Sequence, residues 1–324
     1  MTKELALYGR DLFGEIVKPT SRGPVADRFT FPPFSVLDAK QGAWQERKRA
    51  WTAMGIRGEV GRDALAGGDG TSANSCYTAK RADGSSATVG ELHEEGDGNL
   101  SSIFDPVVCE LAYRWWCPPE GQVVDPFAGG SVRGIVAGAL GRKYWGCDLR
   151  QEQIDANKAQ ADEIGVEPRP LWVCGDSMDE LEHAPRADFV FSCPPYGDLE
   201  KYSDEPGDLS AMEWPTFVAA YKRIILRSVS ALKPNRFACF VVGDFRDKRG
   251  HYRNFVSQTI DGFEQAGARL YNEAVLATSV GSASMRVTRQ FNGGRKLVKT
   301  HQNILVFVKG DWRIAARNCE KAAE

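Results

Sequence analysis

"QVVDPFAGGSVRGIVAGALGRKYWGCDL", residues 122 to 149, contains a short apolar run, a glycine-rich turn, an amphipathic stretch and a second apolar run that ends on an acid. The two apolar runs predict buried strands, and the stretch from Ser131 to about Leu140 predicts the helix that joins them. Strands joined through a helix in this way pair in parallel. This unit alone indicates an α/β fold built around a parallel sheet.

The same alternation continues to about residue 310. Later strands are predicted in "PLWVCGD", "ADFVFSC", "RFACFVVGD", "RLYNEAVLAT" and "NILVFVKG", and the helices between them in "QEQIDANKAQADEIG", "MEWPTFVAAYKRIILRSVSALK" and "NFVSQTIDGFEQAG". Strands that alternate with helices form a mostly parallel sheet with helices on both faces. The fold class that we expect is therefore α/β, with a doubly wound sheet.

Composition divides the chain into four zones. The zone of residues 63–99 is rich in glycine, serine and aspartate. It has too few large apolar groups to offset its chain entropy, so it is predicted to be flexible. In the first zone, Trp44 to Met54 has a helical pattern, with Lys48 and Trp51 near the face of Trp44. The zones are an aromatic and basic accessory segment (1–62), a flexible linker or loop (63–99), the α/β domain (100–310) and a C-terminal tail (311–324).

The overall composition is that of an ordinary soluble protein, with 42% hydrophobic and 26% charged residues. A net charge of −2 means that a nucleic acid would have to meet local basic patches. The eight cysteines contain no C-x-x-C pair and the four histidines are far apart, so we expect reduced thiols and no metal. No apolar run approaches the ~20 residues of a membrane helix, and no signal peptide is evident. We expect a cytoplasmic protein that contacts no membrane.

Four predicted strands end in residues that carry chemistry. "DPFAGGS" (125–131) follows the first of them, Asp148 ends the second, Asp176 the third and "SCPPY" (192–196) the fourth. In open α/β sheets, ligands bind beyond the carboxyl ends of the strands, so these residues are expected to meet. An acid about twenty residues after a glycine-rich turn fits a ribose-containing cofactor, although the G-x-G-x-x-G and P-loop patterns are absent.

Together these motifs resemble those of the S-adenosylmethionine-dependent DNA methyltransferases that modify N4 of cytosine or N6 of adenine. "VVDPFAGGS" resembles their cofactor motif D-P-F-x-G-[ST]-G, "SCPPY" their catalytic motif [DNS]-P-P-[YFW], and "SSIFDPVVCELAYRWWCPP" the segment that covers the methionine end of the cofactor. Over residues 100 to 310 the resemblance implies a class I (Rossmann-like) methyltransferase fold, with seven strands of which the last is antiparallel. The cofactor-binding residues that it implies are Phe104, Asp105, Asp125, Phe127, Gly129, Gly130, Ser131, Asp148, Asp176, Ser177 and Ser192.

The resemblance also implies that Cys193, Pro194, Pro195 and Tyr196 hold a base that has been flipped out of the DNA duplex. The Pro194 carbonyl would accept one hydrogen of the exocyclic amine, and Tyr196 would stack on the base. The sequence departs from the family at two places. Gly130 and Ser131 stand in reversed order, and Cys193 stands where the family has Asp, Asn or Ser. A neutral thiol is a weak acceptor for the second amine hydrogen.

The cysteine leaves several hypotheses open. In the first, Ser192 or a neighbouring carbonyl accepts the hydrogen and Cys193 is a bystander. In the second, Cys193 is a nucleophile that adds to C6 of cytosine and activates C5, which requires a lowered thiol pKa and a cation from another segment. A nucleic-acid-binding module on an inactive methyltransferase fold, and a methyltransferase acting on RNA or on protein glutamine, are further alternatives.

DNA is the partner that we expect, in a modification role like that of restriction-modification enzymes. Two stretches mix basic and aromatic residues, "RDKRGHYRNF" (246–255) and "RVTRQFNGGRKLVKTH" (286–301), a mixture that suits phosphate contacts and base stacking. The helix around "WQERKRAW" could serve in recognition or docking, and both a monomer and a homodimer fit the sequence. The predicted substrate-binding residues are Lys201, Tyr202, Arg286, Arg289, Arg295 and Lys296.

Overall fold

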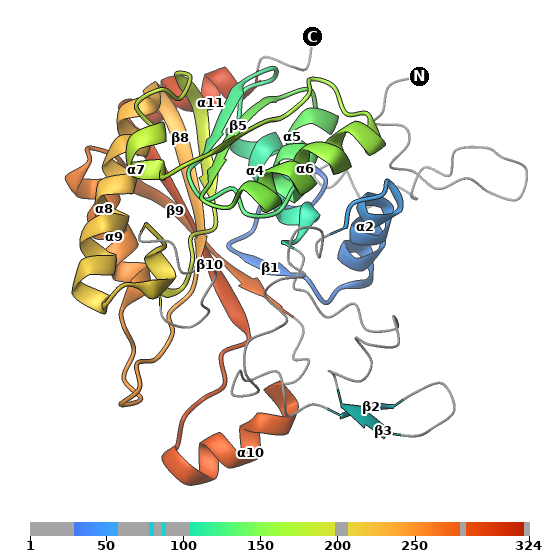
Figure 1. Cartoon of the computed structure of the whole chain (residues 1–324), viewed down its shortest axis with the longest axis vertical. Helices are drawn as coiled ribbons and strands as arrows, with labels where there is room; N and C mark the ends of the chain where they lie inside the picture. Colours follow the sequence, from blue (N-terminus) through green and yellow to red (C-terminus); the bar gives the residue numbers. More distant parts are fainter. Residues whose placement is uncertain are drawn as a thin grey trace, which may run out of the picture.

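The computed structural model describes residues 29–57, 78–80, 86–88, 104–197, 207–278 and 283–320. Its main sheet has eight strands in the order β1-β9-β10-β8-β7-β4-β5-β6. Figure 1 shows this sheet between the helices. A separate pair, β2 (Thr78–Lys80) and β3 (Ser86–Thr88), lies in the predicted linker zone, most of which is outside the described residues. The strands of the main sheet are β1 (Val36–Asp38), β4 (Gln122–Asp125), β5 (Lys143–Asp148), β6 (Leu171–Cys174), β7 (Ala187–Ser192), β8 (Leu232–Val242), β9 (Arg269–Ala277) and β10 (His301–Lys309).

The pairing of the strands identifies the fold. The five strands from β6 to β8 in the sheet order pair in parallel, and β10 inserts antiparallel between β8 and β9. This is the class I methyltransferase (Rossmann-like) fold, as expected. Seven strands were expected, and the structure adds an eighth, β1. It was not predicted because it is only three residues long and gains its order from pairing in parallel with β9.

Helices cover both faces of the sheet (Figure 1). The apolar sides of α2, α4, α5, α6 and α11 belong to one core cluster, and those of α8 and α9 belong to the other, which α7 also joins. The predicted helices are confirmed, whereas α4, α7 and α10 were not predicted as helices. The bounds are α2 (Gly42–Ala53), α4 (Pro106–Trp116), α5 (Val132–Ala139), α6 (Gln151–Ile164), α7 (Ser177–Glu180), α8 (Trp214–Ala231), α9 (Phe255–Gln265), α10 (Ala283–Gly294) and α11 (Trp312–Glu320).

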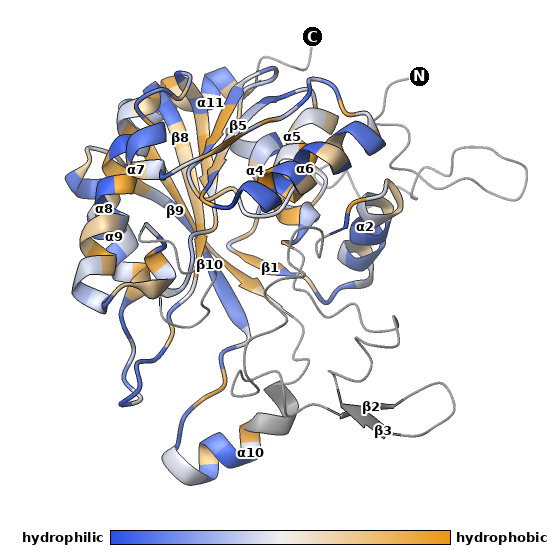
Figure 2. Cartoon of the chain, viewed as in Figure 1, coloured by the Kyte–Doolittle hydropathy of each residue, from blue (hydrophilic) through white to orange (hydrophobic). Residues whose placement is uncertain are grey.

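The central strands are apolar on both faces, as a doubly covered sheet requires. In β7, Phe189 and Phe191 pack into the cluster on the α4 side, while Val190 between them packs into the cluster on the α8 side. Figure 2 shows the same hydrophobic concentration along the strands, with hydrophilic residues on the outer sides of the helices. None of the helices in the described ranges is long and apolar enough to cross a membrane.

The described part of the N-terminal zone, residues 29–57, is integrated into this domain. Helix α2 packs on α4 through Glu110, a fully buried carboxylate. Burial opposes its charge, but hydrogen bonds from Arg47 and Trp51 and the charge of Arg114 outweigh burial and lower the pKa of Glu110. The aromatic face of α2 is therefore an internal surface, with Trp51 fully buried.

Candidate active site

A cavity of about 490 Å³ lies beyond the carboxyl ends of β4, β5, β6 and β7. It brings together twelve of the fifteen residues that the sequence assigns to cofactor and catalysis. Asp125, Ser131 and Ser192 are the other three, and they are buried outside its lining. Lys201 and Tyr202 lie outside the described residues. The predicted residues in the lining are Phe104, Asp105, Phe127, Gly129, Gly130, Asp148, Asp176, Ser177, Cys193, Pro194, Pro195 and Tyr196.

The glycine turn after β4 forms one wall of the cavity without side chains. Gly129 has a left-handed φ of +49°, and a Cβ placed on Gly130 would meet no atom within 4 Å. Asn157 of α6 donates its side-chain amide to the Gly129 carbonyl over 2.7 Å. The hydrogen bond from Asn157 thus fixes the turn, and the space beside Gly130 leaves room for a ligand close to the backbone.

Asp148, at the end of β5, holds the same turn from the other side. Its carboxylate accepts the backbone N–H of Gly129 and that of Arg150, each over 3.0 Å. Desolvation raises the pKa of Asp148 above its ordinary value, although these two hydrogen bonds and the charge of Arg150 oppose the rise. Carboxylate oxygens can accept further hydrogen bonds, so Asp148 is suited to bind a ligand that presents hydroxyl groups.

Asp176 and Ser177 are fixed at the start of α7. Asp176 caps the helix by accepting the Met178 N–H over 2.8 Å, and Ser177 donates its hydroxyl to the Pro126 carbonyl. A Cβ placed on Gly207 would lie 3.0 Å from the Asp176 carboxylate, so the chain at Gly207 passes close to this acid. Asp176 can therefore accept hydrogen bonds from a ligand between the two segments.

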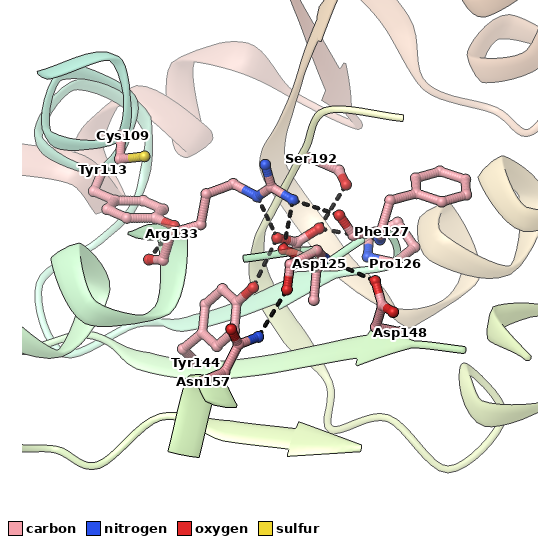
Figure 3. Close-up of polar contacts among 12 residues, drawn as sticks. Cys109, Tyr113, Asp125, Pro126, Phe127, Arg133, Tyr144, Asp148, Asn157 and Ser192 are labelled. Carbon is pink, nitrogen blue, oxygen red and sulfur yellow. Dashed lines mark hydrogen bonds and ion pairs between the residues drawn. The ribbon is translucent and has the colours of Figure 1, made fainter. Parts of the chain in front are cut away.

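Beneath the cavity floor lies a buried network centred on Asp125 (Figure 3). Its carboxylate accepts the hydroxyls of Ser192 (2.5 Å) and Tyr144 (2.7 Å) and the backbone N–H of Phe127 (3.1 Å). Arg133 completes it with an ion pair of 2.5 Å. Asp125 therefore joins β4, β5 and β7 directly under the glycine turn, and it does not line the cavity.

Arg133, in the first turn of α5, was missed from the sequence. Besides its bond to Asp125, its guanidinium donates to the carbonyls of Phe127 and Ala128 and lies 4.8 Å from the centre of the Phe104 ring. Burial lowers the pKa of Arg133, but the charge and hydrogen bond of Asp125, together with the groups of Tyr144 and Cys193, outweigh burial and raise the pKa. The one available signal was a charged residue in the otherwise apolar "VRGIVAGA".

Cys193 follows β7 and packs, partly buried, against the core cluster on the α4 side. Its thiol is free of a disulfide and lines the cavity together with Arg133. The two groups interact electrostatically, which contributes to the raised pKa of Arg133. Ser192, the preceding residue, is fully buried and gives its hydroxyl hydrogen to Asp125, so its side chain is turned away from the cavity.

Tyr196 is held at the far end of the tetrapeptide by aromatic and polar contacts. Its ring meets those of Phe245 and Phe255 edge to face, both at 5.9 Å between centres. Its hydroxyl accepts the side-chain amide of Gln302 over 3.0 Å. Gln302 also lines the cavity and was not predicted, because nothing in "HQN" at the start of β10 marks it as a site residue.

A basic surface lies beside this end of the cavity. Position 243 is a glycine, and a Cβ there would lie 3.5 Å from the Lys299 ammonium and 3.7 Å from the Tyr196 hydroxyl. Burial lowers the pKa of Lys299, against the opposing charge of Asp244. A Cβ on Gly250 would likewise run into the Lys296 ammonium. The two basic stretches of the sequence therefore meet along residues 243–250 and 296–299.

Basic and aromatic side chains stack on this surface. The Arg246 guanidinium lies 4.0 Å from the centre of the Tyr252 ring, and that of Arg295 lies 5.1 Å from the Phe291 ring. Arg289 is exposed on α10. Arg286 belongs to the same helix, and the orientation of its side chain is outside what the structure describes. Arg289, Arg295 and Lys296 lie outside the cavity lining.

In the portion of the chain that the structure describes, no three His, Cys, Asp or Glu side chains gather closely enough to hold a metal ion. No protein-family model and no curated protein matches the sequence. Solved structures similar to the chain include TrmN from Thermus thermophilus, at 14% identity and TM-score 0.44, with 64% of this chain and 49% of that chain covered. The chain thus spans about half the length of that protein.

Two further similar structures cover more of their own chains. A TehB-like SAM-dependent methyltransferase from Corynebacterium glutamicum is 18% identical over 68% of this chain and 92% of that one, with TM-score 0.39. Magnesium protoporphyrin IX methyltransferase from Synechocystis is 12% identical over 60% and 71%, with TM-score 0.38. At these scores the similarities carry no inference about substrate, and the fold rests on the strand order described above.

Proposed function

We propose that the chain is an S-adenosylmethionine-dependent DNA methyltransferase that methylates an exocyclic amine of a flipped adenine or cytosine. One observation carries the proposal. A single cavity is lined both by the glycine turn with Asp148 and by the Pro194-Pro195-Tyr196 segment. A group bound at the turn and a base bound at the prolines would therefore share one enclosed space, as a transfer between them requires.

The cavity fits the cofactor in volume and in chemistry. Its volume, about 490 Å³, lies within the range of small-molecule sites. Asp148 offers a carboxylate to the ribose hydroxyls, Asp176 an acceptor to the adenine amine, and Gly129 and Gly130 leave space for close approach. When bound, S-adenosylmethionine supplies an electrophilic methyl group on its sulfonium.

The tetrapeptide holds the base in this proposal. Two prolines restrict the backbone, so the Pro194 carbonyl accepts one amine hydrogen in a fixed direction. The Tyr196 ring, supported by Phe245 and Phe255, stacks on the base. Since the Ser192 hydroxyl is engaged by Asp125, a backbone carbonyl is the better candidate for the second amine hydrogen.

DNA is favoured by the basic surface beside Tyr196. Lys296 and Lys299 follow the backbone of residues 243–250 toward the Tyr196 end of the cavity, and Arg246 and Arg295 stack on exposed aromatic rings. Ammonium and guanidinium groups beside the Tyr196 end of the cavity suit contacts with the phosphates on either side of a flipped nucleotide. Binding to DNA should therefore weaken steeply as salt is added.

The proposal is tested by incubating the protein with duplex DNA and methyl-labelled S-adenosylmethionine and identifying the labelled nucleoside by mass spectrometry. N6-methyladenine or N4-methylcytosine is expected. Label in 5-methylcytosine would overturn amine transfer, and label in an RNA competitor but not in DNA would overturn the DNA assignment. Absence of label in both would leave the binding-module alternative.

A second candidate is methylation at C5 of cytosine, with Cys193 as the nucleophile. The observation that favours it is the Arg133 guanidinium, a cation from another segment that interacts with the thiol. In this route the thiolate adds to C6, C5 takes the methyl group, and loss of the C5 proton releases the enzyme. Arg133 is already paired with Asp125, which weakens its effect on the thiol and favours the amine route.

Cys193→Ser separates the two routes by exchanging one atom. For amine transfer, turnover is expected to stay within about tenfold of the wild type, because a hydroxyl accepts hydrogen bonds at least as well as a thiol. For C5 transfer the loss would be on the order of 10⁶-fold, as for removal of a covalent nucleophile. Single-turnover rates measure the difference, and Cys193→Ala controls for the loss of any polar atom.

Tyr196→Ala is expected to lower kcat/KM for DNA by about tenfold to a hundredfold, the range expected when one stacked base loses its aromatic partner. Affinity for S-adenosylhomocysteine should stay unchanged, since the lost ring faces the base. Tyr196→Phe is the matched control, because it keeps the ring and removes the hydroxyl that accepts from Gln302. Full activity in Tyr196→Ala would contradict the stacking role.

A further inference from the structure

Helix α2, from the N-terminal zone, forms part of the cavity wall. Lys48 and Gln45 of this helix line the cavity, as does Asp105 at the start of α4. The Lys48 ammonium lies 3.7 Å from the Asp105 carboxylate, to which Trp44 also donates its indole N–H over 3.0 Å. The face of α2 that the sequence singled out, with Trp44 and Lys48 one turn apart, is therefore directed at Asp105 and the cavity.

This wall is rigid. Arg47 and Trp51 of α2 donate to the buried Glu110 of α4 over 2.5 to 2.8 Å, which fixes one helix on the other. Asp105 is fixed too, because its second oxygen caps α4 by accepting the Val107 N–H over 2.9 Å. The carboxylate of Asp105 and the helix that carries Lys48 are therefore both fixed at this end of the cavity.

The pair of charges matches the two charges of an α-amino acid. The ammonium and the carboxylate of such a group stand on one carbon, and a cation and an anion 3.7 Å apart can each face one of them. Two other cations line the cavity. Arg133 donates to Asp125 and to two backbone carbonyls, and Arg150 donates to the side chain of Gln153 over 2.8 Å. Lys48, which keeps about a third of its side chain exposed, is better placed to bind a carboxylate.

We infer that Lys48 binds the carboxylate of the amino-acid end of S-adenosylmethionine, with Asp105 accepting its ammonium, so that α2 completes the cofactor site. The inference rests on the proposed function, since it needs the cofactor in this cavity. It assigns a binding role to a helix whose basic residues otherwise suggest contact with nucleic acid. Lys48 determines which adenosine derivatives the site prefers.

Three adenosine derivatives test the inference by calorimetry. Of the two charged groups of the amino-acid end, S-adenosylhomocysteine carries both, decarboxylated S-adenosylmethionine keeps only the ammonium, and 5′-methylthioadenosine has neither. Because decarboxylated S-adenosylmethionine also carries a sulfonium that the other two lack, each variant is compared with the wild type for the same ligand. Lys48→Met is expected to weaken the affinity for S-adenosylhomocysteine by about tenfold or more and to leave the affinities for the other two ligands unchanged. Asp105→Asn keeps a helix-capping side chain. It should weaken the affinity for the two ligands that carry the ammonium and leave the affinity for 5′-methylthioadenosine unchanged. Arg49→Met, an exposed position on the same helix, is the control and should change none of them.

Each remaining outcome is informative. Equal weakening of all three ligands by Lys48→Met would make the residue a structural support of the wall and overturn the inference. Unchanged affinity for S-adenosylhomocysteine would overturn it as well. Wild-type protein that binds none of the three ligands would instead remove the proposed function, on which the inference depends. Retained binding of 5′-methylthioadenosine also shows that each variant is folded.

Discussion

Arg133→Met is expected to lower the free energy of unfolding by about 3–5 kcal/mol, because it leaves Asp125 as a buried charge without its partner. Asp125 is fully buried, and the hydroxyls of Ser192 and Tyr144 cannot supply the missing positive charge. The carbonyls of Phe127 and Ala128 would lose their donor at the same time. The loss exceeds what most surface substitutions produce.

Urea denaturation followed by tryptophan fluorescence measures the change. Arg169→Met is the matched control, since Arg169 makes a two-bond ion pair with Asp162 on the surface, where solvent screens it. This control should change stability little. Asp125→Asn combined with Arg133→Met should recover part of the loss, because the double variant no longer buries an unpaired charge. Equal stability of Arg133→Met and Arg169→Met would contradict the account.

The region around Asp125 contains both features that the sequence could predict and features that it could not. The strands of the sheet were predictable because both faces of each central strand are buried, which leaves local apolar runs. The turn at Gly129 and the acid at Asp148 were predictable because ligands bind at the ends of such strands. That Asp125 lies beneath the cavity, paired with Arg133, depends on side-chain directions that no local pattern records.

In the N-terminal zone, the helix could be predicted from the sequence but its contacts could not. The pattern of Trp44, Lys48 and Trp51 correctly predicted one face of a helix, but its partners lie about sixty residues further along the chain, in Asp105 and Glu110. Contacts of that separation arise only once the domain has folded. The same reason applies to β1, whose three residues carry no strand signal of their own, and to Gln302 beside Tyr196.

Asp148→Ala is expected to weaken binding of S-adenosylhomocysteine by about a hundredfold or more. The substitution removes the carboxylate that we propose as the acceptor for two ribose hydroxyls, and hydrogen bonds to a charged group contribute on the order of 1.5–3 kcal/mol each. It also frees the Gly129 N–H, which holds the glycine turn. Calorimetry measures the affinity, and Asp155→Ala, which removes an exposed acid of α6, is the control. Unchanged affinity in Asp148→Ala would remove the cofactor assignment.

The raised pKa of Asp148 adds a pH dependence with a definite sign. Hydroxyl donors bind the ionised carboxylate, so they lower the pKa of Asp148 in the complex relative to the free protein, where desolvation raises it. Affinity is therefore full above the pKa of the free protein and declines as pH falls through it, at a pH above the ordinary aspartate value. Asp148→Asn cannot ionise and should lose this inflection. An inflection that persists in Asp148→Asn would assign the titration to another group and would contradict this account of the pH dependence.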